Sequence, residues 1–244
     1  MTDSIGSSAL AAQRAQVMSA LRSASAATGA DFDYLVKTAQ RESNFDPSAK
    51  ASTSSATGLF QFTSETWLNM LERYGSEHGV NTAGLTRDAQ LALRSDADLS
   101  ARMAGELARE NAKILGRKLG RPATSAELYT AHFMGPQDAA RLIKAARSND
   151  DGAAAAMFPR AALANHNVFR GVDGDTLTSA QLYRKLTGAD IAMADAGKVP
   201  AGSFETPVKN ADLSIQLAAR LGAAQLASNL MTALFDLQSD TKKA

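Results

Sequence analysis

The sequence contains no cysteine among its 244 residues, which excludes disulfide bonds and thiolate ligands for a metal. Histidine is scarce as well: His78, His132 and His166 lie far apart in the chain, without the close spacing of zinc ligands. We therefore expect no metal site and no cofactor. The absence of cysteine is compatible with an oxidising compartment, although it does not indicate one.

An excess of charge is also absent, because 26 lysines and arginines face 25 aspartates and glutamates, for a net charge of +1. Such a balance gives no strong field to attract nucleic acid, so we expect no nucleic-acid partner. No stretch of about 20 uninterrupted apolar residues occurs, and the first residues lack the basic and apolar regions of a signal peptide. We expect a soluble protein with no membrane span and no evident route of export.

Strand-like alternation of polar and apolar residues is nearly absent, whereas helical spacing with capping signals recurs, so we predict a mostly α fold. Capping boxes begin at Thr124 and Thr178, and Pro136 is placed to open a further helix. The segment 48–61 is predicted to be a loop too polar for the core. We divide the chain into an N-terminal helical extension (1–29), a main domain (30–190), a linker (191–211) and a C-terminal amphipathic helix (212–244).

Glu42 is the candidate for acid chemistry, because it lies on the apolar face of a predicted helix. Leu35 and Ala39 recur at helical spacing, and Glu42 continues the same face. Pro47 ends the helix soon afterwards, which puts Glu42 in or near the last turn. Burial and the negative end of the helix dipole both favour a protonated carboxyl, the form that protonates a leaving-group oxygen. The alternative is a helix-end glutamate that reaches solvent or pairs with a neighbouring cation.

Three segments give Glu42 a recognisable context. They are Glu42-Ser43-x-Phe45-x-Pro47, then Gly58-Leu59-Phe60-Gln61, and then Tyr129-Thr130-Ala131-His132-Phe133-Met134-Gly135-Pro136. In this order and spacing they resemble the soluble lytic transglycosylase (SLT) family of lysozyme-like enzymes that cleave peptidoglycan. The resemblance covers roughly residues 30 to 190 and implies a lysozyme-like helical catalytic domain.

The resemblance also implies roles for individual residues. Glu42 takes the place of the family's single catalytic acid/base, and Gln61 that of a side chain that hydrogen-bonds the sugar. The family often has a serine about ten residues after the catalytic Glu, and Ser52 is the nearest match in a run of four hydroxyl residues. The candidate substrate-binding residues are Ser43, Ser52, Gly58, Leu59, Phe60, Gln61, Tyr129, His132 and Phe133.

The third segment departs from the family pattern. Many members carry Ala-Tyr-Asn before Gly-Pro, whereas His132 and Phe133 stand here where Tyr and Asn are expected. A tyrosine that contacts the catalytic Glu is therefore missing at that position. Either Tyr129, one turn earlier on the same helix face, supplies a hydroxyl, or His132 itself hydrogen-bonds Glu42. A core or rim position for His132 is the remaining alternative.

The number of carboxyl groups bears on the reaction, because most glycosidases use two. Only Glu42 is well placed, since Asp46 precedes Pro47 and is expected to turn the chain. The resemblance implies cleavage of the β-1,4 bond between N-acetylmuramic acid and N-acetylglucosamine, with formation of 1,6-anhydromuramyl ends. The alternatives are a water-using muramidase on the same fold and a non-catalytic peptidoglycan-binding assembly module.

The expected partner is the glycan strand of peptidoglycan, which implies action at the bacterial cell wall, in the periplasm. The apolar face of the predicted helix at 212–244 packs either on its own catalytic domain, or on a partner protein or another copy of this chain. With a partner protein, the enzyme would remodel the wall locally for a flagellar, secretion or phage-like assembly.

Overall fold

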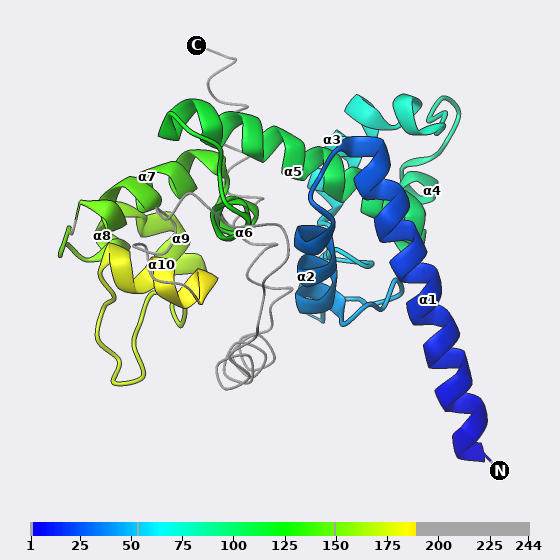
Figure 1. Cartoon of the computed structure of the whole chain (residues 1–244), viewed down its shortest axis with the longest axis horizontal. Helices are drawn as coiled ribbons and strands as arrows, with labels where there is room; N and C mark the ends of the chain where they lie inside the picture. Colours follow the sequence, from blue (N-terminus) through cyan, green and yellow to red (C-terminus); the bar gives the residue numbers. More distant parts are fainter. Residues whose placement is uncertain (1, 53, 149, 189–244) are drawn as a thin grey trace. The chain divides into compact units, whose positions relative to one another are not determined.

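The computed structural model describes residues 2–52, 54–148 and 150–188, which are mostly helical, as predicted. β structure in these residues is limited to isolated bridges. No helix among them combines the length and the apolar composition needed to cross a bilayer. The linker predicted at 191–211 and the helix predicted at 212–244 lie outside the described residues. In chain order (Figure 1) the elements are α1 (Thr2–Thr28), α2 (Phe32–Ser43), α3 (Ser64–Tyr74), the 3-10 turn η1 (Ser76–His78), α4 (Arg87–Ala92), the 3-10 turn η2 (Leu93–Ser95), α5 (Ala97–Leu119), α6 (Ser125–Met134), α7 (Pro136–Arg147), α8 (Ala154–Met157), α9 (Pro159–Ala164) and α10 (Ser179–Thr187).

Two compact units make up the structure. The first is Met1–Glu110, and the second begins at Asn111. The first unit holds α1 to α4 and the beginning of α5, and the second holds the end of α5 and α6 to α10. The predicted main domain at 30–190 takes in residues of both units, and its limits stay a prediction.

The second half of α1 belongs to the core of the first unit. Val17, Leu21 and Ala24 are buried at the spacing of one helix face. At the end of α1, Thr28 comes so close to Gly105 of α5 that a Cβ on Gly105 would lie 2.3 Å from Thr28 Oγ1. A residue without a side chain is therefore needed at this crossing, and the predicted N-terminal extension packs as part of the unit.

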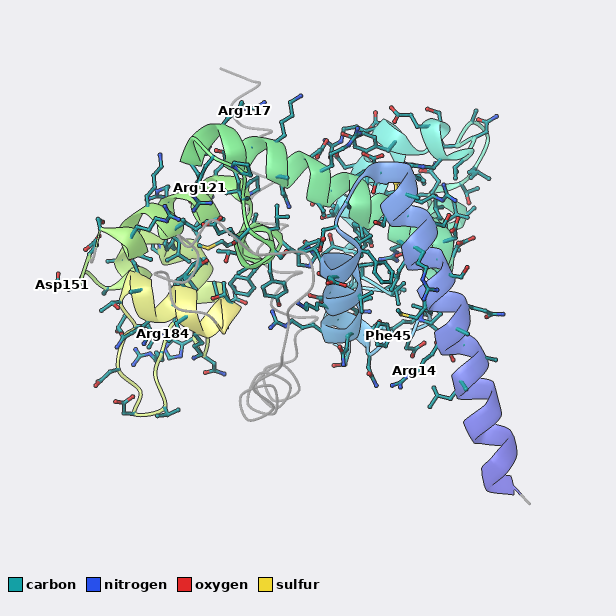
Figure 2. All side chains as sticks on the ribbon, in the orientation of Figure 1. Arg14, Phe45, Arg117, Arg121, Asp151 and Arg184 are labelled. Carbon is teal, nitrogen blue, oxygen red and sulfur yellow. The ribbon has the colours of Figure 1, made fainter. Side chains whose placement is uncertain are left out.

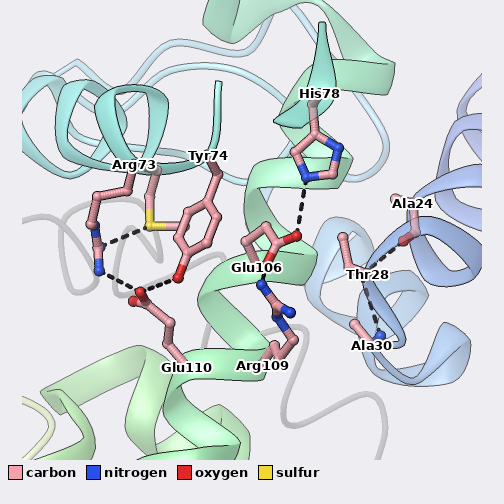
Figure 3. Close-up of polar contacts among 10 residues, drawn as sticks. Ala24, Thr28, Ala30, Arg73, Tyr74, His78, Glu106, Arg109 and Glu110 are labelled. Carbon is pink, nitrogen blue, oxygen red and sulfur yellow. Dashed lines mark hydrogen bonds and ion pairs between the residues drawn. The ribbon is translucent and has the colours of Figure 1, made fainter. Parts of the chain in front are cut away.

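A polar cluster joins α3 and η1 to α5 (Figure 3). His78 Nε2 lies 3.1 Å from Glu106 Oε1, and both side chains are almost fully buried. The Tyr74 hydroxyl donates a hydrogen bond to Glu110, which also pairs with Arg73. Burial and this hydrogen bond raise the pKa of Tyr74 to about 12. The cluster fixes α3, the helix that follows the Gly58-Leu59-Phe60-Gln61 motif.

The core of the second unit is built from α6, α7 and α10. Leu142 of α7 and Leu182 of α10 are fully buried in it. Glu127 of α6 is also fully buried, and Arg121 donates to its two carboxylate oxygens at 2.9 and 2.5 Å. Burial alone would raise the pKa of Glu127, but the hydrogen bonds from Arg121 and the Thr124 amide outweigh it, so the pKa lies below its usual value.

Both predicted capping boxes are present. Thr124 Oγ1 accepts a hydrogen bond from the Glu127 amide, and the Glu127 carboxylate accepts one from the Thr124 amide. Thr178 and Gln181 form the same reciprocal pair at the start of α10. Pro136 opens α7, as predicted. These local signals fix the helix starts in the second unit, which carries the third motif.

Candidate functional site

Glu42 lies in the last turn of α2, with 7% of its surface exposed. The helix starts at Asp31, whose carboxylate accepts a hydrogen bond from the Tyr34 amide at 2.7 Å. Leu35 and Ala39 are fully buried on the face that the sequence predicts. The prediction that Glu42 shares this buried face is confirmed.

Backbone strain gathers around the end of α2. Asn44 and Phe45 have φ angles of 51° and 66°, and Gln61 has 49°. Within the described parts of the chain, these three are the non-glycine residues with positive φ. The reversal lets the amides of Asn44 and Phe45 bond back to the carbonyls of Gln40 and Ala39, which closes the helix. Bulky residues adopt such angles only where the surroundings hold them there, so this turn is a constrained one.

Ser43 links the Glu42 helix to the second motif. Its hydroxyl lies 2.9 Å from the Leu59 carbonyl oxygen and 3.2 Å from that of Ala39, and it can donate to either. The two motifs are 16 residues apart at this contact, and the fold brings them together directly. A shift of the Leu59 carbonyl would therefore disturb Ser43, the residue that follows Glu42.

The turn from Gly58 to Gln61 is held from inside. Gln61 is 3% exposed, and its Nε2 donates to the carbonyls of Ala49 and Gly58 at 3.2 and 2.8 Å. The side chains of Leu59 and Phe60 are buried as well. Contact of these two apolar residues with a glycan would therefore involve their backbone, and the sugar contact of Gln61 stays a prediction.

Asp46 and Ser52 lie in the stretch of chain between the end of α2 and the Gly58 to Gln61 turn. Asp46 Oδ1 accepts hydrogen bonds from the amide and the hydroxyl of Ser48, at 2.8 and 2.7 Å. Asp46 thus turns the chain, as the sequence predicts. Ser52 is exposed, and its contact with a substrate stays a prediction.

A cationic side chain from α1 supports the turn after α2. The guanidinium carbon of Arg14 lies 5.9 Å from the centre of the Phe45 ring, in a cation–π contact (Figure 2). Phe45 is half-buried and carries the largest positive φ among the described non-glycine residues. Arg14 therefore covers one of the strained positions beside the Glu42 helix.

The third motif lies in the second unit, with Tyr129 to Met134 on α6 and Pro136 at the start of α7. The rings of Tyr129 and His132 stack with their centres 6.0 Å apart, so the two residues share one helix face, as predicted. Both are half-buried. Phe133 is 3% exposed and packs in the core of the second unit, which leaves little of its side chain for a ligand. An interaction of Tyr129 or His132 with Glu42 stays a prediction.

The first two motifs and their helix thus have the geometry of a constrained site around a buried carboxyl. Residues 19–150 match the transglycosylase SLT domain, a match that covers more than half of the chain. The chain belongs to this family. Its fold is the mostly α, lysozyme-like SLT type, and its function is of the peptidoglycan-acting, lytic transglycosylase type. The SLT match begins within the half of α1 that is buried in the first unit.

Sequence reasoning overlooks one residue that holds the loop of this SLT domain. Arg94 in η2 is 9% exposed, and its Nη1 donates to the carbonyls of Ser55 and Phe62. No local pattern marks it, since an arginine in a short polar turn is ordinarily solvated. Its partners lie more than 30 residues away, so a sequence without its fold gives no signal for this contact.

Proposed function

We propose that this SLT domain cleaves the β-1,4 bond between N-acetylmuramic acid and N-acetylglucosamine with Glu42 as the single acid/base. The observation that carries the proposal is the burial of Glu42 at the end of α2, next to the residue that binds the Leu59 carbonyl. A carboxyl in this position is largely buried, and the second family motif contacts the residue that follows it. Both properties suit a group that delivers a proton to a sugar bound at the second motif.

In the proposed reaction the carboxyl group of Glu42 donates its proton to the glycosidic oxygen, and the bond from that oxygen to C1 breaks. The N-acetyl group of the muramic acid stabilises the positive centre at C1. The C6 hydroxyl oxygen then bonds to C1, and its proton passes to the Glu42 carboxylate. The products are a free N-acetylglucosamine end and a 1,6-anhydromuramyl end, no water is consumed, and Glu42 regains its proton.

The surroundings of Glu42 favour this one-carboxyl reaction over a two-carboxyl hydrolysis. A second carboxylate would be needed as base or nucleophile in an ordinary glycosidase. Asp46 is the nearest candidate in sequence, and its Oδ1 is bonded to the amide and hydroxyl of Ser48. An acid with that structural task is a poor second catalytic group, and the C6 hydroxyl of the sugar supplies the missing function.

The proposal also assigns substrate contacts. The backbone of the Gly58 to Gln61 turn, with Ser43 beside it, lines the glycan groove, and Ser52 borders it. The stacked pair of Tyr129 and His132 presents a half-buried aromatic face suited to a sugar ring.

Glu42→Gln tests the proposal, because it keeps the volume of the side chain and removes the ionisable proton. We expect release of soluble products from purified sacculi to fall by at least about 100-fold. Asp46→Asn is the matched control: it keeps an oxygen to accept the bonds from Ser48 and should retain activity. Circular dichroism should show the same helix content in all three proteins.

Mass spectrometry of the released muropeptides separates the remaining alternatives. Anhydro ends, one water lighter than reducing ends, support the transglycosylase reaction, whereas reducing ends would show a water-using muramidase. Binding to sacculi without any product from the wild-type protein would favour a non-catalytic assembly module. Activity of Glu42→Gln at the wild-type level would contradict the role of Glu42.

The cellular setting is part of the same proposal. Cell-wall peptidoglycan is the substrate that the SLT family implies, and the bacterial periplasm is the proposed place of action. In this proposal the predicted helix at 212–244 binds a protein of a flagellar, secretion or phage-like assembly, and the enzyme remodels the wall locally for that assembly.

A further inference from the structure

We infer that Arg94 is a positioning residue for the glycan-cleaving reaction: it holds both ends of the 55–62 loop and thereby fixes Ser43 and Glu42. The inference deepens the proposed function and rests on it. Arg94 belongs to no motif of the sequence, and it contacts the site only through the loop.

The environment of Arg94 is unusual for an arginine. Its side chain is buried, and its partners are backbone carbonyls: Nε donates to Leu91 at 3.0 Å, and Nη1 to Ser55 and Phe62 at 2.5 and 3.1 Å. No carboxylate of the described residues forms an ion pair with it. Burial accordingly lowers the pKa of Arg94. A buried cation without a counter-ion is costly, and the hydrogen bonds to the loop offset that cost.

The positions of its partners make Arg94 a clamp on the loop. Ser55 and Phe62 flank the turn that carries the second motif, so one guanidinium spans the two ends of that turn. The Phe62 carbonyl also accepts a bond from the Thr57 amide at 3.1 Å, which closes the loop onto itself. The main chain of Arg94 also packs closely against this loop, because a Cβ added to Gly58 would lie 2.1 Å from the Arg94 carbonyl oxygen.

The path from this clamp to Glu42 is short. Leu59 lies in the middle of the clamped turn, and its carbonyl is 2.9 Å from the Ser43 hydroxyl. Ser43 follows Glu42 in the last turn of α2. Loss of the clamp would let the Leu59 carbonyl move, and with it the support of the helix end that presents the acid. Misplacement of a reacting group by about 1 Å can cost about 100-fold in rate.

Arg94→Met and Arg94→Lys test the inference, with Leu21→Ala as a control that destabilises the same unit away from the loop. Met fills part of the space without donors. Lys keeps the charge but loses Nε, which bonds the Leu91 carbonyl and orients the guanidinium so that Nη1 reaches Ser55 and Phe62. Leu21 is fully buried in α1 and makes no contact with substrate in the proposal. The steady-state kinetics use soluble, uncross-linked peptidoglycan strands, so that kcat and KM are measured separately.

For Arg94→Met we expect kcat to fall by about 10- to 100-fold with KM changed by less than about threefold. Arg94→Lys should recover part of the loss, whereas Leu21→Ala should keep kcat within about twofold of wild type. Kinetics of Arg94→Met equal to those of Leu21→Ala would overturn the inference. If Arg94→Met does not fold, Arg94→Lys carries the same comparison.

Two structural readouts do not depend on activity. Amide exchange at Thr57, Gly58 and Gln61, whose amides bond within the loop region, should speed up in Arg94→Met and stay unchanged in Leu21→Ala. The emission of Trp67, the sole tryptophan, should shift, because its ring packs against Phe62 with centroids 5.4 Å apart. An unchanged loop by both readouts would overturn the inference even if kcat fell.

The failure of the proposed function is distinguishable from the failure of this inference. An active Glu42→Gln variant would contradict the catalytic role of Glu42, whatever the Arg94 variants do. An inactive Glu42→Gln variant together with wild-type kcat in Arg94→Met would leave the catalytic role intact and remove the positioning role.

Discussion

Replacement of Gly58 by alanine should destabilise the first unit far more than its backbone angle alone requires. Gly58 has a φ of +85°, a conformation in which an added Cβ costs about 1–2 kcal/mol. The same Cβ would lie 2.1 Å from the Arg94 carbonyl oxygen, far inside contact distance. Because the Arg94 side chain is bonded to Ser55 and Phe62, that carbonyl cannot retreat without disturbing the clamp. Forced repacking of this kind costs a further ~1–3 kcal/mol.

The chain offers a matched control for this prediction. Gly84 has nearly the same φ, +82°, lies in the same unit, and has nothing within 4 Å of its added Cβ. Gly84→Ala should therefore lose only the ~1–2 kcal/mol of the backbone term. Urea unfolding followed by Trp67 emission measures both variants against the wild type. Because the two substitutions are chemically identical and the two φ angles nearly equal, any difference in stability loss reports the contact of the added Cβ at Gly58 with the Arg94 carbonyl.

The difference between the two variants decides the reasoning. We expect Gly58→Ala to be less stable than Gly84→Ala by at least ~1 kcal/mol, the lower limit for forced repacking. Gly58→Ala should also lose activity on sacculi, whereas Gly84→Ala should not. Equal stability losses in the two variants would refute the idea that the Arg94 backbone fixes the loop by contact.

Two further predictions concern titrating groups outside the loop. An unfolded tyrosine ionises near pH 10, whereas burial and Glu110 raise the pKa of Tyr74 to about 12. The stability that its neutral form contributes is therefore full below about pH 10 and is lost between about pH 10 and 12. Urea unfolding across this range should show a smaller loss of stability for Tyr74→Phe than for the wild type, and an equal loss would contradict the assignment. Arg121→Met should cost about 3–5 kcal/mol at neutral pH, because it leaves Glu127 buried without its main cation. The pKa of Glu127 is lowered in the folded state, so the stability from its ionised form is present above the unfolded pKa near 4.3 and is lost as the pH falls through the folded pKa. The unfolding free energies of wild type and Arg121→Met should therefore converge in acid. A difference between them that stays constant with pH would contradict this.

Features that depend on neighbours in sequence could be predicted well. The capping boxes at Thr124 and Thr178 and the helix start at Pro136 involve residues within three positions of each other, so their pattern is visible in the sequence. Neighbouring hydroxyl residues leave a cap ambiguous in the sequence: at the start of α3, Thr63 and not the adjacent Ser64 accepts the bond from the Thr66 amide. The short helices α4, α8 and α9 have too few turns to show a helical period.

Features that depend on distant partners could not be predicted. The polarity of segment 48–61 predicts an exposed loop, yet Gln61 is buried at its end, together with Leu59 and Phe60. Burial is tolerated there because the polar groups are bonded: Gln61 to two carbonyls, and the loop carbonyls to Arg94. A side chain 39 residues from its partner leaves no trace in the local pattern.

Contacts both local and long-range hold the strained backbone at this site. Asn44, Phe45 and Gln61 hold positive φ angles that cost free energy in any non-glycine residue. Each is held by a contact: Asn44 by the bonds that close α2, Phe45 by Arg14 of α1, and Gln61 by the two carbonyls that its side chain bonds. A relaxed site would need none of them. Their concentration around Glu42 is what a preorganised acid requires, because the protein then bears the cost of placing the carboxyl during folding and not during the reaction.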